Sequence, residues 1–169
     1  LFKWVYSKSQ FIYVLCSDFK KVLDELNMNI PIVLTTTKVN DKLLENFDIT
    51  AKIGKVEQLL FLARLEKTKG IYELLDAFKI LQSKYQNLSL SVCGSGTELA
   101  SAQMYVKEND IANVVFHGNL SGSKLVEQFV CSDVYILPTY EEGMATSVLE
   151  SMAFGLPIIS RPVGGVKDF

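Results

Sequence analysis

From residue 58 onward, short apolar runs alternate with amphipathic segments, and no other feature limits the possible folds of this chain as strongly. Each apolar run has the length of a strand, and each amphipathic segment has the period of a helix. Strands that are separated by helices pair in parallel and carry the helices on both faces of the sheet. The sequence therefore predicts an α/β fold with a doubly wound, Rossmann-like parallel sheet. We expect strands at 58–63, 88–93, 114–116, 133–137 and 157–160, and helices at 70–85, 97–109, 121–131 and 146–154.

A strand, a helix and a second strand are expected before this region. The apolar runs 11–16 and 30–34 predict the strands, and Asp18 is expected to cap the intervening helix. Residues 35–55 have no clear period and predict a long connection with a short helix near 43–47. The first residue is Leu1, so we expect the start to be a cut through a longer protein.

Composition excludes several classes of function. The net charge of -2 argues against a nucleic-acid partner, which would normally require a basic surplus. The chain has three cysteines, an odd number, and each lies beside apolar residues. This pattern predicts buried free thiols in a reducing compartment such as the cytoplasm. With His117 as the single histidine and no Cys-x-x-Cys pair, we expect no metal site. The cysteines are Cys16, Cys93 and Cys131.

The loop after the strand at 58–63 predicts an anion site. Ligands of doubly wound folds bind at the carboxyl ends of the strands, and this loop places Arg64 and Lys69 before a helix that starts near Gly70. A guanidinium, an ammonium and a helix N-terminus together suit a diphosphate. The alternative is that both cations are ordinary solvated surface residues.

The loop after the strand at 133–137 predicts a site for sugar hydroxyls. Gly143 and Ala145 leave backbone amides open to close approach before a helix that starts near Thr146. Glu142 is expected at the loop tip, and Glu150 lies about one turn into the helix. Carboxylates accept hydrogen bonds from the vicinal hydroxyls of ribose or hexose rings.

Gly94-Ser95-Gly96 could begin a dinucleotide fingerprint, but Leu99 stands where the third glycine should be. NAD binding is therefore not supported, and the glycines also fit a tight turn between strand and helix. No serine or cysteine lies in a nucleophile-elbow pattern, which argues against hydrolase chemistry.

Together, these loops resemble one family. The most specific part is the run from Glu142 to Ile159, in which seven residues separate Glu142 from Glu150. It resembles the C-terminal, donor-binding domain of glycosyltransferase family 4, a family of retaining enzymes with the GT-B architecture. The likeness covers about residues 56–169 well and residues 10–40 more loosely. It is carried by Arg64-Leu-x-x-x-Lys69-Gly70, Gly94-x-Gly96, Phe116-x-Gly118, Pro138-x-x-x-Glu142-Gly143 with Glu150, and Gly164-Gly165.

The resemblance implies roles for these positions. Arg64 and Lys69 would bind the donor diphosphate and stabilise charge on the leaving group, and Glu142 would contact hydroxyls of the transferred sugar. Glu150 would hold the ribose hydroxyls, and no metal or other cofactor would be needed. The other implied donor-binding residues are Gly94, Asn119, Leu120, Gly143, Met144, Ala145 and Thr146. Four positions depart from the family pattern in size but not in charge: Ala63, Met144, Ala145 and Ser151.

The resemblance also implies a domain organisation and partners. Residues 1–37 would be a remnant of the acceptor-binding domain, and residues 38–169 would be a nucleotide-sugar-binding domain truncated at its C-terminus. We expect hexose transfer to a glycan or lipid-linked acceptor in cell-surface polysaccharide synthesis, at or near the inner face of a membrane. The missing N-terminal domain would be a partner in cis, and the chain alone is expected to be inactive. Any peripheral membrane association would use regions absent from this chain. The alternatives are a nucleotide-sugar epimerase or phosphorylase of the same architecture, or a non-catalytic scaffold. No lysine here has the context that a phosphorylase requires for pyridoxal phosphate.

Overall fold

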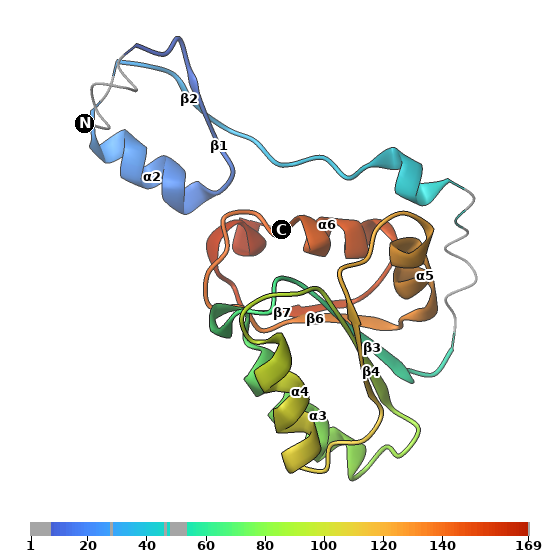
Figure 1. Cartoon of the computed structure of the whole chain (residues 1–169). Helices are drawn as coiled ribbons and strands as arrows, with labels where there is room; N and C mark the ends of the chain where they lie inside the picture. Colours follow the sequence, from blue (N-terminus) through green and yellow to red (C-terminus); the bar gives the residue numbers. More distant parts are fainter. Residues whose placement is uncertain (1–7, 28, 46, 48–53, 169) are drawn as a thin grey trace.

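The fold centres on a five-stranded parallel sheet in the strand order β5-β4-β3-β6-β7. The computed structural model describes residues 8–27, 29–45, 47 and 54–168. Figure 1 shows α3 and α4 on one side of this sheet and α5 and α6 on the other, which confirms the predicted doubly wound α/β fold. The strands are β3 (Gln58–Leu62), β4 (Ser89–Cys93), β5 (Val114–Gly118), β6 (Val134–Leu137) and β7 (Ile158–Ser160). The helices are α3 (Ile71–Gln82), α4 (Leu99–Glu108), α5 (Ser123–Cys131) and α6 (Thr146–Ala153).

The strand order contains a switch point. From β3 the chain moves outward through β4 to β5, and it then crosses back to β6 and continues in the opposite direction to β7. Neighbouring strands β3 and β6 therefore send their following loops in opposite directions across the sheet. In open α/β sheets, this is where a crevice forms at the carboxyl ends of the strands.

A smaller strand–helix–strand unit precedes the sheet. It consists of β1 (Ile12–Val14), α2 (Ser17–Glu25) and β2 (Ile32–Leu34), and the two strands pair in parallel. The predicted cap was wrong by two positions, because Cys16 holds the N-cap position and Asp18 lies in the first turn. The short helix expected near 43–47 is a 3-10 turn, η1 (Asp41–Leu44). Part of the predicted connection, at 46 and 48–53, lies outside the described residues.

The small unit contacts the last turn of the larger one, η4 (Gly164–Asp168). The Asp168 carboxylate accepts hydrogen bonds from the backbone N–H of Ser17, at 2.8 Å, and from its hydroxyl, at 2.6 Å. Lys167 forms an ion pair with Asp18. The domain boundary expected after residue 37 stays a prediction.

The main core lies on both faces of the central strands. Leu60, Phe61, Phe78, Phe129 and Tyr135 are completely buried. Burial raises the pKa of the Cys93 thiol to about 12. Cys16 is buried as well, but the prediction that all three cysteines are buried was wrong, because Cys131 ends α5 at an exposed position.

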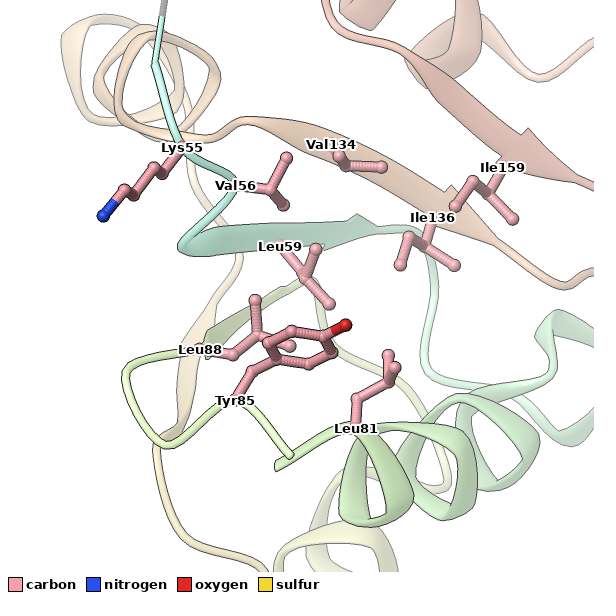
Figure 2. A pocket seen from close by; sticks show the side chains of 9 residues that line it. All are labelled: Lys55, Val56, Leu59, Leu81, Tyr85, Leu88, Val134, Ile136 and Ile159. Atoms are coloured by element: carbon pink, nitrogen blue, oxygen red, sulfur yellow. The ribbon is translucent and has the colours of Figure 1, made fainter. Parts of the chain in front are cut away.

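An apolar hollow of about 530 Å³ lies on the α3 side of the sheet. Successive strand residues point to opposite faces, so Leu59, Val134 and Ile136 face this side, while Tyr135 faces the other. Figure 2 shows Leu81, Tyr85 and Ile159 completing the walls, with the Lys55 ammonium directed away. Among the described residues, no helix is long and apolar enough to cross a bilayer.

Candidate functional site

The carboxyl ends of β3 and β6 open onto two adjoining hollows. The inner one, which we call the charged cleft, has a volume of about 440 Å³ and is bounded by the end of β3, the 138–145 loop and the first turns of α6. The outer hollow, of about 580 Å³, lies between the same loops and residues 16–19 of the small unit. Arg64, Lys69 and Glu142 line both. The charged cleft therefore continues outward toward α2.

Close backbone contacts position the loop that carries Arg64. A Cβ atom on Gly94 would lie 1.9 Å from the Ala63 carbonyl oxygen, and one on Gly96 would lie 2.3 Å from that of Leu65. Both glycines therefore let the β4–α4 loop pack directly behind this segment. The backbone N–H of Leu65 donates to the Ser95 carbonyl at 2.9 Å, which fixes the contact.

Arg64 projects from this loop into solvent. Its side chain is 74% exposed and forms a 3.0 Å ion pair with Glu66. An exposed pair of this kind contributes little to stability. The guanidinium can therefore exchange Glu66 or water for an anionic ligand at small cost.

Lys69 is much more confined and pairs with Glu142. The Lys69 Nζ lies 2.7 Å from Glu142 Oε1, and each side chain is only 12% exposed. The same ammonium donates to the Glu141 carbonyl oxygen at 2.8 Å. An ammonium has three protons, so one remains for a ligand. Glu142 lies in the loop as predicted, and its carboxylate is turned inward, where it pairs with Lys69.

Two neighbouring segments support the loop that carries Glu142. The backbone N–H of Tyr140 donates to the Thr68 carbonyl at 2.8 Å, which ties this loop to the end of η3 (Lys67–Lys69). Gly164 has φ of 53°, and a Cβ atom there would lie 1.6 Å from the Glu142 carbonyl oxygen. The next N–H, of Gly165, donates to the Gly143 carbonyl at 2.8 Å. The glycine pair thus lets η4 pack against the back of the loop.

Glu150 extends into the charged cleft from α6. It is half-buried, and burial raises the pKa of its carboxyl group. Among the residues that the structure describes, its carboxylate has no hydrogen-bond or ion-pair partner. A carboxylate in this position can accept hydrogen bonds from ligand hydroxyls.

The structure brings most of the predicted site residues together. Those that line the charged cleft are Arg64, Lys69, Glu142, Met144, Ala145, Thr146 and Glu150, and Gly143 lines the outer hollow. Gly94 lies behind the Arg64 loop and lines neither hollow. Asn119 and Leu120 follow β5, two strands away from β3, and also line neither.

Sequence reasoning missed two hydroxyl groups at this site. Ser147 lines the charged cleft, and its Oγ lies 2.7 Å from the hydroxyl of Tyr135. Ser147 could have been found, because it precedes Glu150 by three residues and shares its helix face. Tyr135 could not, since it lies inside an apolar strand. The His117 side chain lies away from the cleft, where its Nε2 atom forms a 3.1 Å hydrogen bond with Ser91 Oγ.

No metal site is formed within the described parts of the chain, where no three His, Cys, Asp or Glu side chains cluster. The groups that face the charged cleft are instead two cations, two carboxylates and the N-terminal amides of α6. This set can bind an anion and a polyhydroxyl group side by side.

Comparison with known proteins adds an independent finding. The sequence model of the family described as glycosyl transferases group 1 matches residues 44–169. An uncharacterized glycosyltransferase of Haemophilus influenzae is 33% identical over 112 residues, which are 64% of this chain and 31% of that protein. The capsular polysaccharide biosynthesis glycosyltransferase CapM of Staphylococcus aureus is also 33% identical, over 64% of this chain and 28% of that protein.

Solved structures agree on the fold. The pneumococcal O-GlcNAc transferase GtfA, determined in complex with UDP and GlcNAc, superposes with a TM-score of 0.77 at 21% identity. That match covers 92% of this chain and 31% of the GtfA chain. The chain thus spans less than a third of each of these three proteins.

Proposed function

The chain belongs to the glycosyl transferases of group 1, and from this membership we propose that it binds the nucleotide diphosphate sugar of a retaining hexosyltransferase. The acceptor is a glycan or a lipid-linked glycan, and the reaction serves cell-surface polysaccharide synthesis. The relationship to a capsular polysaccharide glycosyltransferase supports this choice of pathway.

One observation carries the proposal: two cations and two carboxylates share a single cleft at the switch point of the sheet. Arg64 and the unused proton of Lys69 bind the diphosphate, together with the amides at the start of α6. Glu142 contacts hydroxyls of the transferred hexose, and Glu150 contacts those of the ribose. The donor thus lies across the cleft with its phosphates at the cationic end.

The same groups assist the chemistry. When the bond between the anomeric carbon and the diphosphate oxygen breaks, negative charge grows on the departing diphosphate. Fixed positive groups aimed at that oxygen stabilise the transition state more than the ground state. Arg64 and Lys69 fill this role in our proposal, and no metal cofactor is required.

The acceptor approaches from the outer hollow. This hollow adjoins the charged cleft and is walled on one side by Cys16, Asp18 and Phe19 of the small unit. An acceptor-binding domain in cis supplies the remaining contacts, so the chain by itself is expected to turn over no substrate. We place the reaction in the cytoplasm, at or near the inner face of the membrane.

The comparisons do not favour the epimerase or phosphorylase alternatives, since the matched family is one of glycosyl transferases. A non-catalytic scaffold would share the fold but not require the cations. A thermal-shift panel of UDP, GDP, ADP and their glucose conjugates tests the scaffold alternative, because a ligand that binds only the folded state raises the melting temperature. We expect one nucleotide to do so.

A matched pair of double variants makes the test specific. The variant R64A/K69A removes both cleft cations and should abolish the shift. The control K67A/K79A removes two exposed lysines outside the cleft and should preserve it. A panel in which no nucleotide raises the melting temperature would favour the scaffold.

A further inference from the structure

The hydroxyl of Ser147 is held in one orientation by a buried tyrosine. Tyr135 is completely buried in β6, and its hydroxyl lies 3.0 Å from the Leu62 carbonyl oxygen and 2.7 Å from Ser147 Oγ. Leu62 is the last residue of β3, and Ser147 is in the first turn of α6. This short chain of hydrogen bonds therefore joins the end of β3, which leads into the Arg64 loop, to the helix that carries Glu150.

Counting protons fixes the direction of each bond. A carbonyl oxygen can only accept, and two oxygens 3.0 Å apart repel unless a proton lies between them. The single phenolic proton of Tyr135 is thus committed to Leu62. The Ser147 hydroxyl must donate its own proton to the phenolic oxygen, which leaves Ser147 Oγ with lone pairs only.

The arrangement persists across the pH range in which proteins are stable. Burial of the Tyr135 ring, reinforced by the charges of Glu142 and Glu150, raises the pKa of the phenol above its ordinary value of 10.0. The phenol therefore keeps its proton, and Ser147 keeps its acceptor role.

We propose that Ser147 is a specificity-determining residue of the charged cleft, and that it accepts a hydrogen bond from a hydroxyl group of the bound nucleotide sugar. Ser147 and Glu150 are three residues apart on α6, and both line the cleft. Each side chain offers lone pairs and no proton, so together the two side chains select a ligand part that carries hydroxyl donors. The proposal rests on the proposed nucleotide-sugar function.

The hydroxyl could belong to the ribose or to the hexose, and ligand analogues distinguish them. Dissociation constants are measured by NMR titration of the whole chain with UDP, 2′-deoxy-UDP, 3′-deoxy-UDP and UDP-glucose. If the nucleotide panel selects GDP or ADP, the corresponding analogues replace these. Ser147→Ala should weaken UDP binding about fivefold, the usual size of one hydrogen bond. The loss should vanish for the analogue that lacks the recognised ribose hydroxyl. A loss with UDP-glucose alone would assign the bond to the hexose.

Two further variants separate recognition from general structural damage. Ser151→Ala removes a hydroxyl of the same helix that donates to the Ser147 carbonyl, at 2.7 Å, and should leave every dissociation constant within about twofold. Tyr135→Phe frees the Ser147 proton and should shrink the discrimination between UDP and the sensitive analogue to about twofold. Circular dichroism verifies that each variant is folded.

Each outcome has one meaning. Wild-type chain that binds none of the nucleotides contradicts the proposed function itself. Wild-type binding that Ser147→Ala weakens equally for all analogues, or does not weaken at all, overturns the role of Ser147 and leaves the proposed function intact.

Discussion

Strand β6 separates two hollows of similar size and opposite character. On one side, Val134 and Ile136 line the apolar hollow of about 530 Å³. The residue between them, Tyr135, points the other way and supports the charged cleft of about 440 Å³ through Ser147. Alternate residues of one strand therefore serve two purposes. Volume therefore does not distinguish the two hollows, whereas the placement of charges at the carboxyl ends of the strands does.

The two regions should also differ in what they contribute to the free energy of unfolding. The side chains that form the floor of the apolar hollow are buried away from water, and this burial stabilises the fold. In the charged cleft, the half-buried carboxylate of Glu150 has no hydrogen-bond or ion-pair partner among the described residues, so it costs stability. Substitutions should therefore separate stability from nucleotide binding.

The largest effect on stability is expected from Leu59→Ala. Leu59 is only 4% exposed at the floor of the apolar hollow, and deletion of a buried leucine side chain costs about 3 kcal/mol. The UDP dissociation constant of the folded protein should not change. Urea denaturation measures the free energy of unfolding, and NMR titration measures the dissociation constant. Val56→Ala, at a 55% exposed position of the same hollow, is the matched control and should cost under about 1 kcal/mol. Weaker nucleotide binding by Leu59→Ala would mean that the two regions are coupled.

Lys69→Ala should affect both quantities. This variant leaves the Glu142 carboxylate confined without its cation. Loss of one partner costs several kcal/mol in a fully buried ion pair. Because each side chain here is 12% exposed, we expect the free energy of unfolding to fall by about 2 kcal/mol. The variant also removes a group that we propose to bind phosphate, so UDP should bind at least about tenfold more weakly. Lys67→Ala changes an exposed lysine in the same turn and serves as the control. If both variants unfold at the same urea concentration, the ion pair contributes nothing to stability.

The fold was predictable because each strand and helix follows from a local pattern. The run 134–137 is apolar throughout, and Gly155 ends α6 with φ of 71° in the left-handed region that glycine accommodates. The sheet then brings the carboxyl ends of its strands to one edge. That geometry explains why Arg64 and Glu150, distant in sequence, could be expected in one cleft.

Other parts of the site could not be read from the sequence because they depend on tertiary contacts. The inward turn of Glu142 requires Lys69 at 2.7 Å, and the Ser147 hydrogen bond requires Tyr135 on another element. Gly94 was assigned to donor binding through the family resemblance. The close neighbour is instead the Ala63 carbonyl, which only the packed structure reveals.

Glu150→Gln should raise stability while it weakens binding. Burial raises the pKa of Glu150, so the folded chain holds this proton more tightly than the unfolded chain. The free energy of unfolding therefore falls as pH rises from the ordinary pKa of 4.5 through the raised pKa. Glutamine removes this loss, and the gain at pH 7 should be below about 1 kcal/mol because the group is half exposed.

The measurement is urea denaturation of Glu150→Gln at several pH values, together with UDP titration. Glu127→Gln, at an exposed position of α5, is the control and should change neither quantity. A variant that is less stable than wild type at neutral pH would show that the Glu150 carboxylate stabilises the fold instead of costing stability.

The smallest effect on stability is expected from Ile159→Thr in the apolar hollow. Ile159 is 58% exposed on β7, and threonine keeps the branched Cβ that suits a strand, so the free energy of unfolding should change by less than about 0.5 kcal/mol. The fluorescent dye ANS binds exposed hydrophobic surface, and the variant should bind it less well than wild type. Saturating UDP should leave the ANS signal unchanged, because the charged cleft lies on the other side of β6. Displacement of ANS by UDP would place both ligands in one region and would remove the distinction between the two hollows.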